Sequence, residues 1–87
     1  MNVEDLLSSK GRVKILKVLF RDGHSNITRL VRETGLNHKL VSKHIEELKK
    51  MGLVEERRYG RMRIVYVNLS DPRVSAIREA LKILGIL

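Results

Sequence analysis

The segment GLNHKLVSKHIEELKKMG, residues 35–52, places hydrogen-bonding side chains at the start of a predicted helix. Val41, Ile45 and Leu48 follow helical spacing and predict one buried face for a helix over about residues 37–51. The exposed first turns carry Asn37, His38, Lys39, Ser42 and Lys43. Such side chains bind phosphates and base edges, and the major groove of DNA, ~12 Å wide, admits one helix. The segment therefore predicts a recognition helix for duplex DNA.

Residues 53–69 change to side chains that favour strands, such as Val54, Ile64 and Val65. Tyr59-Gly60 is predicted to be the turn of a hairpin, the wing. The basic and aromatic side chains around this turn are Arg57, Arg58, Tyr59, Arg61 and Arg63. They could clamp phosphates or the minor groove, or act as edge-strand charges that discourage aggregation. The position at the tip favours DNA contact, and Tyr59 could either brace the tip or lie on a sugar.

Helices are also predicted before the recognition helix. Asn2 can cap a short first helix, a second helix spans about residues 10–21, and Asn26 opens a third over 27–34. Gly35 supplies the positive φ needed for a sharp exit from the third helix. In a helix-turn-helix, the helix before the turn braces the recognition helix against the DNA backbone.

A last helix is predicted over about residues 72–86, with Asp71 as its cap and Pro72 at its first position. The apolar residues that we expect in a homodimer interface are Val74, Ile77, Leu81 and Leu84, together with Val3, Leu6 and Leu7 of the first helix. The alternative is that the C-terminal stripe packs on the core of its own chain. An intermolecular role is favoured because this helix carries more large aliphatic side chains than one small face requires.

The composition indicates one small domain, residues 1–87, with a polyanionic partner. The formal net charge is +8, and the chain has only one Phe, two Tyr and no Trp. Proteins that bind single strands by stacking need aromatic platforms, so the scarcity of aromatics favours duplex DNA. No apolar run approaches the ~20 residues of a membrane-spanning helix, and the N-terminus lacks the pattern of a signal peptide. A cytoplasmic protein is therefore predicted.

Metal, cofactor and enzymatic roles find no support in the sequence. The chain has no Cys, and its three histidines, His24, His38 and His44, are dispersed rather than grouped as zinc ligands. It has no glycine-rich phosphate loop and no paired carboxylates in an apolar setting. We expect a structural or solvated role for His44, and no catalytic residue, metal or cofactor.

The order of helix, helix, turn, helix and basic hairpin predicts a winged helix-turn-helix, mainly α with a small β-hairpin. The segments SSKGRVKILKVLFRDG and NITRLVRETGLNHKLVSKHIEELKKMGLVEERRYGRMRIVYVNL resemble the ArsR-type winged-helix regulators, and MarR-like and other archaeal winged-helix proteins are similar. The resemblance implies a homodimeric, sequence-specific transcriptional regulator that binds a roughly palindromic operator. The Cys-containing motif of the family's metal sensors is absent, so metal sensing of that type is not implied.

Two other functions fit the same sequence. A basic winged-helix dimer could coat DNA as a low-specificity architectural protein. A winged-helix domain could also serve as a protein-protein interaction module within a larger complex. Leu40 leaves a smaller question open, because it departs from the small polar residue common at its position. Packing on Val31 is favoured over contact with a thymine methyl group.

Overall fold

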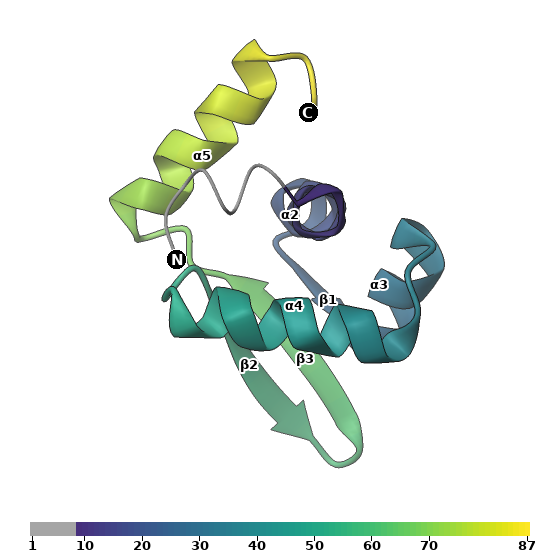
Figure 1. Cartoon of the computed structure of the whole chain (residues 1–87). Coiled ribbons are helices and arrows are strands. Elements are labelled where there is room, and N and C mark those ends of the chain that lie inside the picture. Colours follow the sequence, from purple (N-terminus) through teal and green to yellow (C-terminus); the bar gives the residue numbers. More distant parts are fainter. Residues whose placement is uncertain (1–8) are drawn as a thin grey trace.

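Figure 1 shows the computed structural model of the chain, which describes residues 9–87. In chain order, the elements are α2 (Lys10–Asp22), β1 (His24–Asn26), α3 (Ile27–Thr34), α4 (His38–Lys50), β2 (Val54–Tyr59), β3 (Met62–Val67) and α5 (Pro72–Ile83). The predicted fold, a mainly helical winged helix-turn-helix, is confirmed. The helix predicted at Asn2, with Val3, Leu6 and Leu7, lies outside the described residues.

Side-chain caps begin the helices where the sequence predicts them. Asn26 accepts a hydrogen bond from the backbone N–H of Arg29, at 2.7 Å, and so opens α3. Asn37 opens α4 in the same way, with its Oδ1 2.8 Å from the N–H of Leu40. Each cap satisfies one of the N–H groups that the first turn of a helix leaves without a partner. Between these helices Gly35 has a φ of 74°, which allows the sharp exit from α3.

The sheet has three antiparallel strands in the order β1-β3-β2. The sequence predicted only the hairpin of β2 and β3, and the short strand β1 was missed. Its residues pair across to β3, with His24 opposite Tyr66 and Asn26 opposite Ile64. A strand of three residues is too short for alternation to reveal it, and its pairing depends on a partner distant in sequence. β1 joins α2 and α3 to the base of the wing.

The hairpin turn lies one residue later than predicted. Tyr59 pairs with Met62, so Gly60 and Arg61 form the turn. Gly60 has a φ of 63°, whereas no non-glycine residue in the described part of the chain has a positive φ. A two-residue turn of type II′ needs glycine at its first central position. This requirement places Gly60, rather than Tyr59, at the start of the turn and leaves Arg61 at its tip.

The C-terminal helix packs on its own chain. Val74, Ile77 and Leu81 are 1%, 8% and 0% exposed and belong to the hydrophobic core. Side chains so buried in one chain have little surface left for a partner. Val74, Ile77 and Leu81 therefore pack in the core of their own chain, whereas the sequence predicted them in a dimer interface. The helical stripe identified a buried face, but it could not show which chain buries it. Leu84 of the same stripe is 66% exposed, and Ile83 is 77% exposed.

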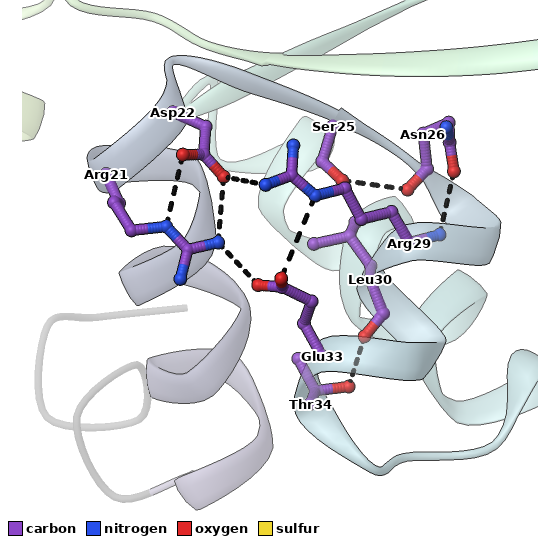
Figure 2. Close-up of polar contacts among 8 residues, drawn as sticks. All are labelled: Arg21, Asp22, Ser25, Asn26, Arg29, Leu30, Glu33 and Thr34. Carbon is purple, nitrogen blue, oxygen red and sulfur yellow. Dashed lines mark hydrogen bonds and ion pairs between the residues drawn. The ribbon is translucent and has the colours of Figure 1, made fainter.

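A cluster of four charged side chains joins α2 to α3, as Figure 2 shows. Arg21 forms ion pairs with Asp22, at 2.9 Å, and with Glu33. Arg29 pairs with Asp22 at 2.8 Å and more distantly with Glu33, at 3.9 Å. Hydrogen bonds from Arg21 hold the pKa of each carboxyl below its usual range. The cluster ties the helix that braces α4 to the body of the domain.

Candidate nucleic-acid interface

The residues predicted for the recognition helix lie together on α4. His38, Lys39 and Lys43 are exposed, and Ser42 is half-buried. The opposite face of α4 is closed, since Val41, Ile45 and Leu48 are each 0% exposed. Asn37 is exposed at the start of α4, where its Oδ1 is occupied by the cap. The solvent-facing side of α4 therefore carries two cations, an imidazole and a hydroxyl that a partner could contact. Leu40 is half-buried.

His44 lies on the inner side of α4 and has a structural position. Its side chain is 8% exposed, against α2. Burial lowers the pKa of His44, and the nearby charges of Arg12 and Lys43 lower it further. The guanidinium of Arg12 forms an ion pair with Glu47, one turn further along α4. Because His44 faces the core, it does not belong to the surface that the other α4 residues present.

The wing residues predicted to act together are divided between the two faces of the sheet. Side chains alternate along a strand, so Arg58 and Arg63, which pair across the hairpin, share the face of the buried Val65. Arg57 and Tyr59 point to the opposite face. There the guanidinium of Arg57 lies 5.3 Å from the ring centroid of Tyr66, and the Tyr59 hydroxyl lies 3.4 Å from that of Tyr66.

Arg63 is held within the protein. Its Nε and Nη2 atoms donate to the two carboxylate oxygens of Glu56, each at 2.9 Å. Its Nη1 lies 3.4 Å from the Oγ of Ser42 on α4. The hydrogen bonds with Arg63 lower the pKa of Glu56, and those with Glu56 raise the pKa of Arg63. Arg63 therefore connects the wing to the recognition helix, in contrast to the solvent-exposed Arg58 and Arg61.

A basic groove of about 430 Å³ lies between α3, the start of α4 and the tip of the wing. Its lining residues are Asn26, Ile27, Thr28, Arg29, Arg32, His38, Arg61, Met62 and Arg63, and none of them is acidic. Arg32 and Arg61 are exposed, and neither forms an ion pair with any residue in the range 9–87. The groove thus brings free positive charge from two separate elements to one place.

The α3 part of this groove was missed from the sequence. The sequence predicts a bracing helix over residues 27–34, and the inward positions of Ile27 and Leu30 leave Thr28 and Arg32 of that helix facing solvent. Of the two arginines of α3, Arg29 is engaged by Asp22 and Glu33 of the charge cluster (Figure 2).

Within residues 9–87, no group of three or more His, Cys, Asp or Glu side chains is placed to hold a metal ion. In the same range, no helix has the length and apolar character to cross a membrane.

Comparison with solved structures gives matches across most of the chain. The antimony-specific transcriptional repressor AntR matches with a TM-score of 0.80 and 23% identity, over 93% of this chain and 71% of that one. The repressor BigR from Xylella fastidiosa matches with a TM-score of 0.80 and 20% identity, over 93% and 80%. A homodimeric winged helix-turn-helix DNA-binding domain from Mycobacterium bovis, a possible ArsR-family transcriptional regulator, gives 0.76 and 25%, over 95% and 74%. No curated protein sequence matches significantly.

The fold and the basic surface around α4 define a winged helix-turn-helix transcriptional regulator that binds DNA. The sequence model for bacterial regulatory proteins of the arsR family matches residues 9–56, more than half of the chain. The protein belongs to that family, and the resemblance inferred from its sequence is confirmed.

Proposed function

We propose that the protein acts as a homodimer that binds an inverted repeat in duplex DNA and regulates transcription from that site. The observation that carries the proposal is the cationic surface of α4, where Lys39 and Lys43 face solvent while the opposite face is fully buried. In such a dimer, two copies of α4 enter successive major grooves, ~34 Å apart. Ser42 and His38 add hydrogen bonds to base edges or to phosphates.

The wing and the basic groove supply contacts that carry no sequence information. Arg58 and Arg61 are exposed on the wing, which extends well beyond α4 in Figure 1. Arg32 on α3 and Arg61 on the wing tip line the same groove, and a DNA phosphate seated there would be held from two elements. Phosphate contacts of this kind fix the register of a protein on the duplex, whereas base contacts specify sequence.

The dimer contact is proposed at the end of α5. Ile83 and Leu84 leave a large part of their apolar side chains exposed there, 77% and 66%. In Figure 1, α5 and the tip of the wing lie at opposite ends of the molecule, so pairing through α5 leaves α4 and the wing free for DNA. The homodimeric state of the Mycobacterium bovis domain supports self-association of this chain.

The proposal includes no catalytic step, metal or cofactor, and it places the protein in the cytoplasm. DNA binding needs only the cations and hydrogen-bonding groups described above, and the chain contains no Cys that could serve as a soft metal ligand.

A pair of matched double variants tests the proposal. Lys39→Ala with Lys43→Ala should weaken binding to a mixed-sequence duplex at moderate salt by about tenfold or more, because two phosphate or base contacts are lost. Lys14→Ala with Lys17→Ala removes the same charge from exposed positions of α2, where it should change affinity by less than about threefold. Equal losses in both pairs would show that DNA binding does not depend on the surface of α4 and would contradict the proposal. A wild-type protein without duplex affinity would indicate the protein-interaction module.

A further inference from the structure

Glu56 occupies the centre of a charge network on the face of the wing that looks toward α4. Its side chain is only 6% exposed, although it lies in a hairpin that projects into solvent. The two carboxylate oxygens accept hydrogen bonds from Arg63, and Lys49 Nζ and Arg58 Nε lie 3.7 and 3.8 Å away. One acidic side chain is therefore surrounded by three cations from three elements, α4, β2 and β3.

The network reaches the recognition surface through Arg63. Besides its paired contacts with Glu56, the guanidinium donates to the Oγ of Ser42 at 3.4 Å and lies 3.8 Å from Oε1 of Glu46. A guanidinium can only donate hydrogen bonds. The oxygen of Ser42 is therefore the acceptor in this contact, and the O–H of Ser42 remains available as a donor. Glu56 binds Nε and Nη2 of Arg63 and so fixes the orientation of the planar guanidinium. In this orientation the remaining nitrogen, Nη1, points toward Ser42.

We propose that Glu56 is a positioning residue for base recognition: acting through Arg63, it fixes the Ser42 hydroxyl as a hydrogen-bond donor toward the edge of the base that Ser42 faces. In the major groove, the acceptors for such a donor are purine N7, guanine O6 and thymine O4, whereas cytosine presents a donor. The protein should therefore discriminate at this position in favour of a base with an acceptor edge. This inference rests on the proposed function, since it specifies how α4 reads its site.

For Glu56→Gln, a purely electrostatic role and a positioning role of Glu56 predict opposite effects on the affinity for DNA. Removing a carboxylate from the DNA-facing side of a protein reduces repulsion of the phosphates, so charge alone would tighten binding. Loss of the ionised partner of Arg63 frees the guanidinium from Ser42, so positioning predicts weaker binding and poorer discrimination. Glu55→Gln is the matched control, because Glu55 is the neighbouring residue, lies on the opposite face of the wing and carries the same charge.

Arg63→Lys provides a second variant without a change in charge. A lysine cannot form the two parallel hydrogen bonds to Glu56, so the geometry at Ser42 is lost while the charge remains. Arg57→Lys, on the opposite face, is its control. This pair keeps the inference testable if Glu56→Gln impairs folding, which circular dichroism would detect for each full-length variant.

The experiment measures the affinity of each variant for a duplex selected by the wild-type protein, and for duplexes with each base pair substituted in turn. Glu56→Gln and Arg63→Lys should lower discrimination about threefold to tenfold at the same position as Ser42→Ala, while both controls stay within about twofold of wild type. Unchanged discrimination in these two variants, or a loss spread evenly over all positions, would overturn the inference. Failure of the wild-type protein to select any duplex would instead overturn the proposed function.

Discussion

Gly11 on α2 lies directly against the imidazole of His44 on α4. A methyl group on the Gly11 α-carbon would lie 2.7 Å from Nε2 of His44 and 3.2 Å from its Cδ2. The same methyl would approach Cδ1 of Leu36 to 3.3 Å. His44 is buried and cannot swing into solvent, so the absence of a side chain at residue 11 sets how closely the recognition helix approaches α2.

Gly11→Ala should therefore destabilise the domain. Helix propensity alone favours alanine by about 1 kcal/mol, but overpacking a core contact costs about 1–3 kcal/mol. We expect a net loss of about 1 kcal/mol in the free energy of unfolding, measured by urea denaturation. In a His44→Ala background the conflict with the imidazole is gone and only the 3.3 Å approach to Leu36 remains, so Gly11→Ala should become neutral or stabilising. A Gly11→Ala variant as stable as wild type would contradict the close contact.

Stability should fall as the pH drops below about 6.5, because the pKa of His44 is lowered in the folded state by burial and by Arg12 and Lys43. The unfolded chain then binds a proton that the folded chain does not, so this contribution is complete above the unfolded pKa and is lost below it. One such proton limits the slope to about 1.4 kcal/mol per pH unit. Urea denaturation between about pH 7.5 and 5.5 spans the usual pKa of histidine. Over this range the free energy of unfolding should depend less steeply on pH in His44→Gln than in the wild-type protein. The exposed His38→Gln is the control, and equal slopes for all three proteins would refute the assignment.

Arg32→Ala and Arg61→Ala should each reduce the salt dependence of duplex binding. If each side chain contacts one phosphate, the slope of log affinity against log salt should become shallower by about one unit. Arg57→Ala removes the same charge from the opposite face of the wing, over Tyr66, and should leave that slope nearly unchanged. If Arg32→Ala and Arg61→Ala both keep the wild-type slope of log affinity against log salt, the basic groove does not contact DNA.

Lys43→Ala separates base recognition from phosphate contact at the centre of α4. If Lys43 binds a guanine edge, the substitution should cost about 1–3 kcal/mol in discrimination at one position of the binding site. The measurement is a set of affinities for singly substituted duplexes. Uniform weakening across every sequence would reclassify Lys43 as a phosphate contact.

Ile83→Ser and Leu84→Ser should weaken self-association. Burying one large aliphatic side chain contributes about 1.5–3 kcal/mol, so each change should raise the dimer dissociation constant about tenfold or more. Met62→Ser, at an exposed apolar residue of the wing, is the control. Sedimentation equilibrium would show the difference, and an unchanged dissociation constant in both α5 variants would place the dimer contact elsewhere.

The sequence predicted the elements whose signals are local. Asn26, Asn37 and Asp71 each cap a helix in the structure, because a cap depends on side chains within about three residues. The buried stripe of α4 was predicted by the spacing of its own apolar residues. Strand β1 is not predictable in this way because three residues carry no periodicity. The turn lies one residue later than predicted because its backbone needs glycine at the first of its two central positions.

The features that depend on distant contacts were not predictable in the same way. The pairing of Arg63 with Glu56 depends on the register of the hairpin and on how closely α4 packs against it. No local sequence pattern encodes either of these. Leu81 is an apolar residue on a predicted buried face, but periodicity does not show whether its own chain or a partner covers it. The basic groove joins Arg32 and Arg61, which lie far apart in sequence and meet only in the folded domain.

The most direct test of the account is selection from a randomised duplex library by the full chain at about 150 mM salt, near the physiological ionic strength at which non-specific attraction is screened. We predict recovery of an inverted repeat whose half-sites lie about one helical turn, ~34 Å, apart, because two copies of α4 must reach successive major grooves. Retention of DNA without an enriched sequence, or no retention at all, would contradict a sequence-specific dimeric regulator.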